Sequence, residues 1–396
     1  MEKNKIRNIL RESLNDINEV RIPFNMNVPN DIVMISKIFR KNNYVCLIVG
    51  GAVRDSLLSK TIKDYDLVTD ALPDKVIEML KSQSFIKNIL ETGKSFGVIN
   101  VITNSDEYEI ATMREDVGSG RRPDSVIFSD INTDSKRRDL TINALYYDID
   151  TKEIVDLVGG VDDLKNGIVR TVGAAQDRFG EDRLRILRAI RFAGRFGSGL
   201  DPDVDAALQQ DASLEGISGE RIRDEFIKGL ISAKSTDAYL LMLDKYKLFD
   251  WIFPSLNVDR NVFRRNSNYK YDDYLVLLAR LLKGNNIDVL RKKLNELKYS
   301  ADEIKGIAFL ISMLKLDVKT AYLLKKLQQT SGISDDQIRY FGANEGIPSQ
   351  LLDAFETFKL SVTGPEAMAK FNIGPGPELG QAIQNMETDK FQKLLG

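Results

Sequence analysis

The sequence has 396 residues, of which 43% are hydrophobic and 29% are charged, and its formal net charge is −2. This length indicates two or more domains, and the near-neutral charge excludes a protein that binds nucleic acid through overall basicity. Histidine is absent and Cys46 is the single cysteine, which excludes intramolecular disulfides, histidine-dependent triads and histidine metal clusters. We therefore expect chemistry that uses carboxylates, Lys and Arg side chains, hydroxyl groups and metal ions.

The N-terminal segment does not have the features of a targeting signal, because it carries acidic residues and lacks an apolar core. Residues 1–30 indicate a short helix followed by a linker that contains Pro and Asn. No stretch of the sequence is apolar over the roughly 20 residues that span a bilayer. We therefore expect a cytoplasmic protein that does not contact membranes.

Up to about residue 175, helix and strand patterns alternate. A helix is expected at 30–42, and the apolar run Tyr44–Val49 is expected to be a buried strand that ends at two glycines. The further predictions, in chain order, are a helix that starts in AVRDSLL, a strand around Tyr65–Thr69, a helix near 74–82 opened by Pro73, strands at 96–103 and 107–113, a loop at 114–126, and strands at 142–149 and 153–157.

After about residue 175, apolar residues recur at helical spacing up to the C-terminus, as in RLRILRAIRFAGRF and DDYLVLLARLLKG. In the first of these segments, Ile186, Leu187, Ile190 and Ala193 form an apolar stripe that should face a core. The sequence therefore predicts an α+β fold, in which a mixed sheet with helices is followed by an all-helical remainder.

Two aspartates, Asp64 and Asp66, stand two positions apart in the segment KDYDLVTD. Because side chains alternate along a strand, both carboxylates would face the same side. Neighbouring carboxylates repel each other, and Mg²⁺, which prefers oxygen ligands, relieves that repulsion. The same short pattern also occurs at solvent-exposed strand edges, so alone it does not distinguish a metal site from a surface strand.

Gly50 and Gly51 lie upstream of these aspartates, between a predicted strand and a predicted helix. Paired glycines let the backbone approach a ligand closely, and a helix N-terminus offers N–H groups to phosphate. Arg54, one turn into that helix, could reach the same phosphates. A simple strand-to-helix turn would also explain the glycines.

Two further segments combine arginines with carboxylates. RRDLTINA contains Arg138, Asp139 and Asn143; an Arg fork matches phosphate oxygens, although a capped helix start has the same composition. In GEDRLRILRAIRF, the polar side of a predicted helix carries Asp182, Arg185 and Arg188 at steps of three residues. A salt-bridged, solvent-exposed helix face would show the same spacing.

Together, these motifs resemble the family of class II CCA-adding enzymes and bacterial poly(A) polymerases. Twelve residues, 52–63, separate Gly51 from Asp64, as in the signature of polymerase-beta-type nucleotidyltransferases, and LIVGGAVRDSLL, DYDLVTDALPDKV, RRDLTINALYYD and FGEDRLRILRAIRFAGRF follow in the family's order. The resemblance is strong over about 30–230. It implies an N-terminal extension at 1–30, a nucleotidyltransferase head at 31–175, a base-recognising neck at 176–230, and a helical, RNA-binding body and tail at 231–396.

The resemblance also implies roles for individual residues. Asp64 and Asp66 would hold two Mg²⁺ ions. Glu109, on a strand that runs toward the loop at Arg114, is the candidate for a third catalytic carboxylate near the metals, although a partly buried structural acid would fit the same position. The residues implied to bind the nucleotide are Gly51, Arg54 and Arg138 at the triphosphate, Asp139 and Asn143 at the ribose, Asp182 and Arg185 at the base of ATP or CTP, and Arg188 and Arg191 as phosphate or scaffold contacts.

RNA contacts are expected outside these motifs. The predicted loop at 114–126 resembles the flexible element that helps such enzymes switch from C to A, with Gly118, Gly120, Arg121 and Arg122 in it. Residues 200–396 resemble the part of the family that grips the acceptor and T arms of tRNA. Candidate basic clusters are Arg221 and Arg223, Arg264 and Arg265, Arg291–Lys293, and Lys325 with Lys326, although basic residues on helices are often plain solvated faces.

The implied activity is template-independent addition of C, C and A to the 3′ end of tRNA, with CTP and ATP as substrates. A poly(A) polymerase, or an enzyme that adds only CC or only A, would share the same head motifs. An inactive RNA-binding scaffold is the non-enzymatic alternative, although a scaffold has no need for these acids and arginines together. The sequence leaves the oligomeric state open.

Overall fold

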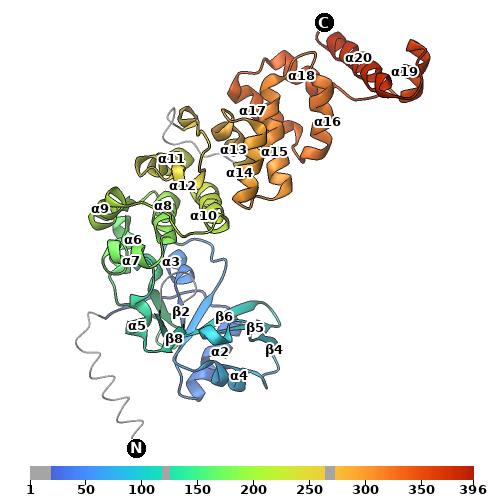
Figure 1. The fold of residues 1–396 in the computed structure, drawn as a ribbon. Helices are drawn as coiled ribbons and strands as arrows, with labels where there is room; N and C mark the ends of the chain where they lie inside the picture. Colours follow the sequence, from blue (N-terminus) through green and yellow to red (C-terminus); the bar gives the residue numbers. More distant parts are fainter. Residues whose placement is uncertain (1–18, 118–124, 264–272) are drawn as a thin grey trace, which may run out of the picture. The chain divides into compact units, whose positions relative to one another are not determined.

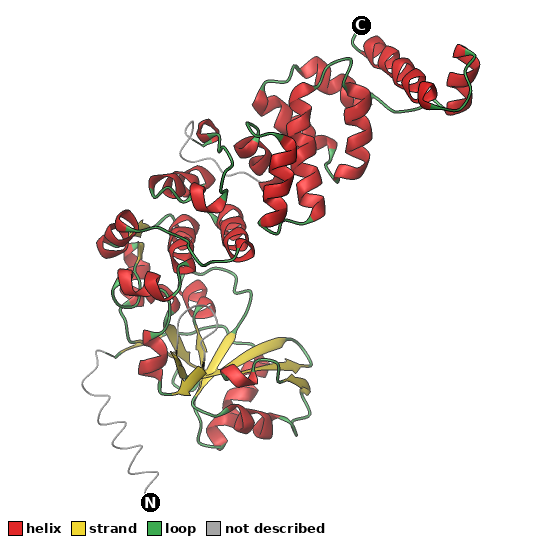
Figure 2. Ribbon diagram, viewed as in Figure 1, coloured by secondary structure: helices red, strands yellow, loops and turns green. Residues whose placement is uncertain are grey.

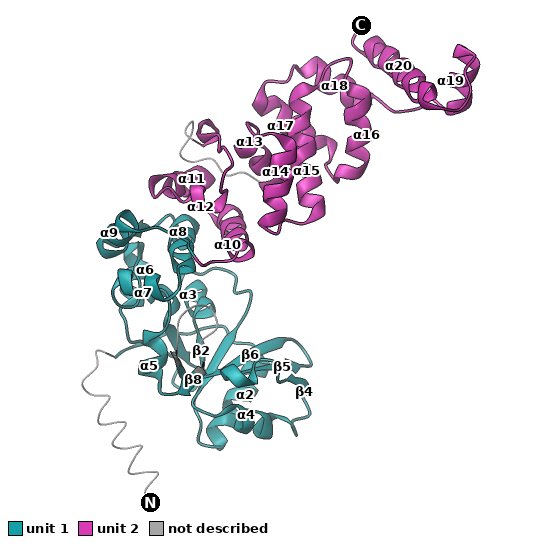
Figure 3. Ribbon diagram, in the orientation of Figure 1, with its two compact units in different colours: residues 1–215 teal, residues 216–396 magenta. Residues whose placement is uncertain are grey.

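A computed structural model of the chain describes residues 19–117, 125–263 and 273–396. The chain divides into two compact units, Met1–Glu215 and Gly216–Gly396, which we describe separately (Figure 3). Within the described residues, strands are confined to the first unit, and the second unit is built from helices (Figure 2). The predicted α+β fold with an all-helical remainder is therefore confirmed.

The first unit is built on a mixed sheet with the strand order β1-β10-β9-β2-β3-β6-β5-β4 (Figure 1). β3 and β6 are parallel, and the other neighbouring strands of this sheet are antiparallel. The strands are β1 (Val20–Pro23), β2 (Cys46–Val49), β3 (Asp66–Thr69), β4 (Ile86–Leu90), β5 (Val98–Thr103), β6 (Glu107–Thr112), β9 (Leu145–Asp148) and β10 (Glu153–Asp156).

Six of these strands lie within the ranges expected from the sequence, whereas β1 and β4 were not predicted. β1 pairs with β10, so residues 20–23 belong to the sheet although the sequence analysis assigned them to an N-terminal extension. Residues 1–18, which include the expected N-terminal helix, lie outside the described part of the chain.

The side chains of the central strands alternate between two cores, one on each face of the sheet. On one face, Ile48 of β2 lies in the same core as Phe39 of α2 (Asn30–Lys41). On the other face, Val49 packs in a smaller core with Tyr146. The candidate site lies on this second face.

The helices of the first unit cover the sheet and continue beyond it. The predicted helices at 30–42, in AVRDSLL and at 74–82 correspond to α2, α3 (Gly51–Leu57) and α4 (Pro73–Leu80). The remaining elements are η2 (Lys94–Phe96), α5 (Ile131–Lys136), η3 (Thr141–Asn143), α6 (Gly160–Asn166), β11 (Ile168–Val169), α7 (Ala175–Glu181), α8 (Leu184–Phe196), β12 (Gly199–Leu200) and α9 (Pro202–Gln210). The predicted apolar stripe of α8 is fully buried.

The segment 114–126, predicted as a loop, contains two strands. β7 (Arg114–Val117) and β8 (Ser125–Phe128) pair as an antiparallel hairpin. The prediction was wrong at both ends because it followed the glycines and charges and gave no weight to the β-favouring residues Val126 to Phe128. Gly118, Gly120, Arg121 and Arg122 lie outside the described residues.

The second unit consists of α10 (Gly219–Ser232), α11 (Thr236–Lys245), α12 (Phe249–Ile252), η4 (Arg260–Val262), α13 (Tyr274–Leu282), α14 (Ile287–Glu296), α15 (Ala301–Ser312), η5 (Met313–Lys315), α16 (Ala321–Ser331), α17 (Asp335–Glu345), α18 (Ser349–Thr357), α19 (Gly364–Phe371) and α20 (Pro377–Leu394). Capping boxes at Ser300, Ser334 and Thr363 satisfy the first N–H groups of α15, α17 and α19. Within the described residues, no helix combines the length and hydropathy that a transmembrane segment requires.

Some of the basic residues proposed to meet RNA are used inside this unit. Arg223 forms an ion pair with Asp224, and Lys325 donates a hydrogen bond to the carbonyl oxygen of Phe355 at 2.9 Å. Arg264 and Arg265 lie outside the described residues. The RNA contacts of the unit therefore stay predictions.

Asp237, in α11, carries a buried carboxyl group. The residue is 2% exposed, and its Oδ1 has no hydrogen-bond partner among the described residues. Burial raises the pKa of Asp237 to about 6, against an opposing effect of Arg280. The charged form is therefore disfavoured in the folded protein.

We expect Asp237→Asn to stabilise the protein more at pH 8 than at pH 5. The stability contributed by protonated Asp237 is full below the pKa of the unfolded chain, near 4, and is lost as the pH rises through about 6. Asparagine does not titrate, so the difference in free energy of unfolding between Asp237→Asn and the wild type should grow as the pH rises from about 4 through about 6. The growth should be at most about 3 kcal/mol. Thermal unfolding at several pH values measures the difference, and a difference independent of pH would contradict the expectation.

Candidate functional site

Asp64 and Asp66 lie close together where β3 begins. Asp66 begins β3, whereas Asp64 precedes the strand by two residues. Tyr65, between them, packs against the core on the opposite face and donates a hydrogen bond to the carbonyl oxygen of Asn27 at 2.9 Å. Both aspartates are exposed. Asp66, which is in register with Val49, therefore lies on the face that holds Tyr146, and Asp64 is close enough to affect its pKa.

The turn at Gly50 lies beside Arg138 and Asn143. Gly50 has a φ of +73°, in the left-handed region that favours glycine. A Cβ atom at this position would lie 3.5 Å from the carbonyl oxygen of Asn143 and 3.8 Å from Nη1 of Arg138. Val49, directly before the turn, is paired with Asp66 in the sheet. The backbone thus brings the turn, the acidic pair and Arg138 together.

The neighbours of Asp66 have opposite effects on its pKa. Removal from water raises the pKa of Asp66, Arg138 counteracts this rise, and Asp64 adds to it. Glu109 is in register with Asp66 across the parallel strands, and its pKa is raised by partial burial and by Asp66. Among the described residues, no three metal-ligating side chains are close enough to form a cluster. The candidates for metal binding stay Asp64 and Asp66, and Glu109 stands opposite Asp66 in the neighbouring strand without forming a three-carboxylate cluster with them.

Arg138 is held by two buried groups that the sequence analysis did not identify. Its Nη2 lies 3.0 Å from Oδ2 of the fully buried Asp134, and its Nε donates a hydrogen bond to the Tyr146 hydroxyl at 3.1 Å. Tyr146 donates to Asp134 at 2.8 Å. Burial alone would raise the pKa of Asp134, but Arg138 and Arg137 outweigh burial and hold it below its usual value. The four-residue spacing between Asp134 and Arg138, which is typical of paired helix side chains, was the available signal.

Asp139 and Asn143 are hydrogen-bonded to each other, and helix α8 joins them through Arg188. Nδ2 of Asn143 donates to Oδ1 of Asp139 at 3.2 Å, and Nε of Arg188 donates to Oδ2 at 2.6 Å. The backbone N–H of Leu140 also donates to Oδ1, at 2.8 Å. Burial alone would raise the pKa of Asp139, but Arg188 and these hydrogen bonds hold it below its usual value. Asp139 is therefore a charged acceptor at neutral pH.

Arg54 lies beneath the site rather than on its surface. The residue is 4% exposed, its Nε donates to Oδ1 of Asp55 at 2.9 Å, and its Nη1 donates to Oδ1 of Asn143. The guanidinium carbon lies 5.0 Å from the ring centroid of Phe192 and 5.3 Å from that of Phe196. The sequence analysis placed Arg54 at the phosphates of the nucleotide. In the structure Nε and Nη1 donate to protein groups and two aromatic rings from α8 cover the side chain, while Nη2 lies 3.5 Å from where a Cβ atom of Gly51 would be.

The helix expected to carry both Asp182 and Arg185 is interrupted, which corrects the predicted geometry. α7 ends at Glu181, α8 begins at Leu184, and Asp182 between them is extended, with φ −147° and ψ 106°. Oδ1 of Asp182 accepts a hydrogen bond from the Leu184 N–H at 3.1 Å. An aspartate side chain that accepts from the N–H two residues ahead favours a turn over a helix interior. Of the three polar residues expected on one helix face, only Arg185 and Arg188 therefore lie on α8.

The guanidinium of Arg185 is fixed by neighbouring groups. Its Nη1 forms an ion pair with Glu181, and its Nη2 donates to the carbonyl oxygen of Arg137 at 3.2 Å. Arg191, by contrast, is 9% exposed, and its guanidinium carbon lies 4.1 Å from the ring centroid of Phe192. Of the two roles considered for Arg191, this geometry favours the scaffold role.

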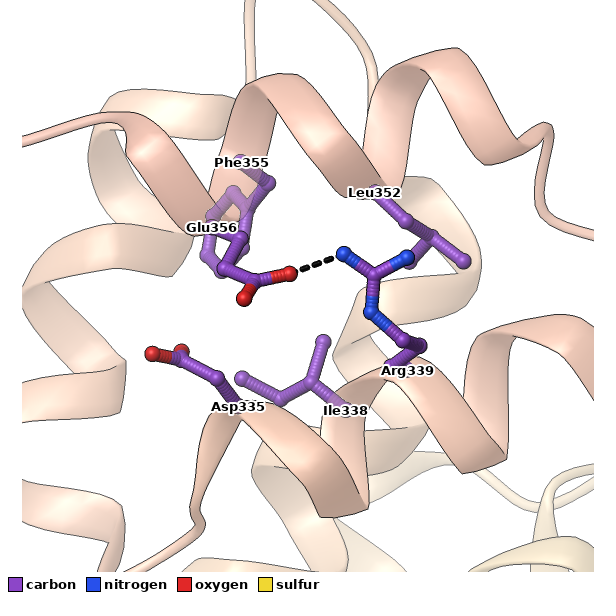
Figure 4. Close-up of a pocket in the computed structure, with 6 residues that line it drawn as sticks. All are labelled: Asp335, Ile338, Arg339, Leu352, Phe355 and Glu356. Atoms are coloured by element: carbon purple, nitrogen blue, oxygen red, sulfur yellow. Dashed lines mark hydrogen bonds and ion pairs between the residues drawn. The ribbon is translucent and has the colours of Figure 1, made fainter.

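The second unit has a small hollow of its own, between α17 and α18 (Figure 4). Arg339 projects across it and forms ion pairs with Asp353, at 2.8 Å, and with Glu356. None of the candidate site residues lines this hollow. The acids, arginines and glycine turn of the first unit therefore stay the candidate site.

Two family models match the chain. The model of the poly A polymerase head domain matches residues 46–170. A second model, described as a probable RNA and SrmB-binding site of polymerase A, matches residues 199–259.

Curated relatives match over different lengths. The CCA-adding enzyme of Streptococcus sanguinis is 33% identical over 360 residues, which are 86% of this chain and 87% of that protein. The CCA-adding enzyme of Lactobacillus helveticus is 43% identical over 200 residues, which are 50% of this chain and 48% of that protein. The higher identity is thus confined to about half of each chain.

Solved structures share the fold over most of the chain. The crystal structure of the Bacillus stearothermophilus CCA-adding enzyme in complex with CTP has a TM-score of 0.72 and 25% identity, and the match covers 93% of this chain and 94% of that one. The Thermotoga maritima CCA-adding enzyme complexed with tRNA has a TM-score of 0.67 and 23% identity, covering 92% of this chain and 93% of that one.

Proposed function

Because the chain belongs to the family of CCA-adding enzymes, we propose that it adds C, C and A to the 3′ end of tRNA, with CTP and ATP as substrates and without a nucleic-acid template. The observation that carries the proposal is the cluster of Asp64 and Asp66 with the Gly50 turn and Arg138 on one face of the sheet. Nucleotidyl transfer needs acids for metal ions next to donors for a triphosphate, and this cluster supplies both.

The donor set of Asp64 and Asp66 fits Mg²⁺. Both residues reach the surface and offer hard oxygen ligands, while neighbouring groups partly remove the carboxyl of Asp66 from water. This partial desolvation and the charge of Asp64 raise the pKa of Asp66, and a bound cation would compensate both effects. Mg²⁺ is commonly bound by one or two carboxylates together with substrate phosphates, so two protein carboxylates suffice. Bound there, two Mg²⁺ ions would lower the pKa of the RNA 3′-OH and neutralise charge at the α-phosphate. Glu109 is proposed as a third carboxylate next to Asp66.

Protein groups would bind and orient the nucleotide. N–H groups at the start of α3, from Gly51 onward, and the guanidinium of Arg138 would hold the triphosphate. Asp139, kept charged by Arg188, and Asn143 would hold the ribose. The 3′-oxygen of the RNA then attacks the α-phosphorus, the bond to the bridging oxygen of the leaving group breaks, and pyrophosphate departs.

Asp182 and Arg185 are proposed to select the base. A carboxylate accepts a hydrogen bond from the exocyclic amine that A and C share, and a guanidinium donates to a ring nitrogen or carbonyl. G and U carry a carbonyl at the corresponding edge, which a carboxylate cannot bond. The fixed position of Arg185, held by Glu181 and the carbonyl of Arg137, supports this role because preorganised donors discriminate best.

The test uses the full chain with Mg²⁺, a tRNA that ends at the discriminator base, and the four NTPs singly and in combination. We expect CTP alone to add two C residues, CTP with ATP to complete CCA, and GTP and UTP to add nothing, as read by sequencing the 3′ ends. The match of the head to poly A polymerases keeps that activity as the alternative. Long A tails from ATP alone would establish the alternative, and products that stop at CC would identify a partial enzyme.

A further inference from the structure

Arg54 belongs to a closed cycle of side-chain contacts that links α3 and η3 to helix α8. Arg54 donates to Oδ1 of Asn143, Asn143 donates to Asp139, and Asp139 accepts from Arg188 of α8. The guanidinium carbon of Arg188 lies 5.9 Å from the ring centroid of Phe192, and that of Arg54 lies 5.0 Å from the same ring. The cycle of contacts therefore begins and ends on α8, and it includes Asp139 and Asn143, the two residues proposed to hold the ribose.

Arg54 and Asp139 hold the Asn143 amide from its two ends. An amide has an acceptor end and a donor end, and its orientation is set by its partners. Arginine only donates, so it binds the acceptor end, Oδ1, and turns Nδ2 toward Asp139. Without Arg54, Oδ1 of Asn143 would lose this donor, and the contact of Nδ2 with Asp139 would have to hold the amide in place.

We propose that Arg54 is a positioning residue for the ribose of the incoming nucleotide, and that it determines how strongly the site prefers ribonucleotides to 2′-deoxyribonucleotides. The inference rests on the proposed function, in which Asp139 and Asn143 hold the ribose.

The hydrogen bonds at Asp139 connect this orientation to the 2′-hydroxyl group. A carboxylate offers about four acceptor positions, and described residues use three of them: the N–H of Leu140, Nδ2 of Asn143 and Nε of Arg188. Among the described contacts, this arrangement leaves one acceptor position of the carboxylate for a hydroxyl of the ligand. An amide held only through Nδ2 would hold Asp139 less firmly, so the contact with a 2′-hydroxyl would weaken while contacts with phosphate and base stayed in place.

The burial of Arg54 suits the positioning of the Asn143 amide better than it suits phosphate binding. Its planar guanidinium serves two acceptors, on Asp55 and Asn143, while its faces lie against the rings of Phe192 and Phe196. A lysine could not serve both acceptors and stack in this way. Because residues from α3, η3 and α8 define its position, Arg54 holds the amide in one orientation before a nucleotide binds.

Arg195 offers a matched control. Its Nη2 lies 2.8 Å from Oδ2 of Asp55, and its guanidinium carbon lies 5.2 Å from the ring centroid of Phe196. Arg195 thus shares with Arg54 the ion pair to Asp55 and the aromatic contact, but no hydrogen bond joins it to Asn143 among the described contacts. Arg195→Met should reproduce the general loss of charge and stacking without releasing the amide.

The experiment compares the wild-type protein with Arg54→Met, Arg54→Lys, Arg195→Met and Asn143→Ala, and with the double variant of Arg54→Met and Asn143→Ala. It measures kcat/KM for CTP and dCTP on a tRNA that ends at the discriminator base, and binding of CTP and dCTP without RNA. Loss of one hydrogen bond should lower the CTP-to-dCTP ratio about tenfold in Arg54→Met. Arg54→Lys should also lower the ratio, Arg195→Met should retain it, and Arg54→Met should have no further effect on it in the Asn143→Ala background.

Thermal unfolding shows which variants fold, and Arg54→Lys decides the question if Arg54→Met does not fold. An equal loss for CTP and dCTP in the Arg54 variants would overturn the inference, as would an equally lowered ratio in Arg195→Met. A wild-type protein that binds CTP in preference to dCTP but adds nothing to tRNA would refute the proposed function, and the binding ratios would still test Arg54. A wild-type protein that binds both nucleotides equally would refute the inference itself.

Discussion

Replacing Asp66 with asparagine should reduce nucleotide addition to tRNA by on the order of a thousandfold or more while the protein stays folded. Asparagine keeps the shape of the side chain and removes the charge that would hold the metal ions. Because Asp66 is exposed at the start of β3, the change leaves both cores of the sheet intact. Asp64→Asn should have a comparable effect. The measurement is the initial rate of CTP addition to a tRNA that ends at the discriminator base, at saturating Mg²⁺.

Asp74 provides the control for this prediction. It is an exposed carboxylate in the first turn of α4, where it forms an ion pair with Lys94 at 2.8 Å. Asp74→Asn removes the same charge from the same unit and should leave the rate unchanged, since surface ion pairs contribute little to stability. Thermal unfolding and tRNA binding should be unaffected in all three variants. A rate within tenfold of wild type in Asp66→Asn would rule out the metal-binding assignment.

The elements that could be predicted from the sequence are those with a strong apolar pattern. β2 is a run of four buried residues, and α8 carries its apolar side chains on one stripe, so both were expected close to their observed positions. β1 and β4 are edge strands whose residues are mostly exposed or half-buried, which leaves little alternation to detect. β1 also depends on pairing with β10, more than 120 residues away, and such a contact is invisible to a local pattern.

The features of the candidate site also differ in how far the sequence could predict them. The spacing of Asp64 and Asp66 predicted a pair on one strand, and the structure places Asp66 at the start of β3 and Asp64 two residues before it. The surroundings of Arg54 depend on Phe192 and Phe196, which follow it by about 140 residues, so the sequence could not reveal that this arginine is covered. The interruption at Asp182 was missed because a single extended residue between two helices hardly disturbs the apolar periodicity on either side.

Replacing Arg138 with glutamine should raise the KM for both CTP and ATP by about a hundredfold, the effect of losing a charge-assisted, two-point contact with phosphate. The guanidinium lies beside the Gly50 turn and near enough to Asp66 to lower its pKa, so it stands between the proposed triphosphate and metal sites. The KM for tRNA should stay the same, because the change affects only the nucleotide side of the reaction. Steady-state kinetics with each NTP and with tRNA as the varied substrate measure the effect.

A variant of Arg137 distinguishes a contact between Arg138 and the triphosphate from a structural effect of the ion pairs with Asp134. Arg137 and Arg138 both bind the buried carboxylate of Asp134, and Nη2 of Arg137 lies 2.8 Å from Oδ1. Arg137→Gln therefore removes one cation from Asp134, as Arg138→Gln does, but leaves the guanidinium beside Gly50 in place. If the two variants raised the KM for nucleotides equally, the loss would come from the network around Asp134. A large effect in Arg138→Gln alone would mean that its guanidinium itself meets the triphosphate.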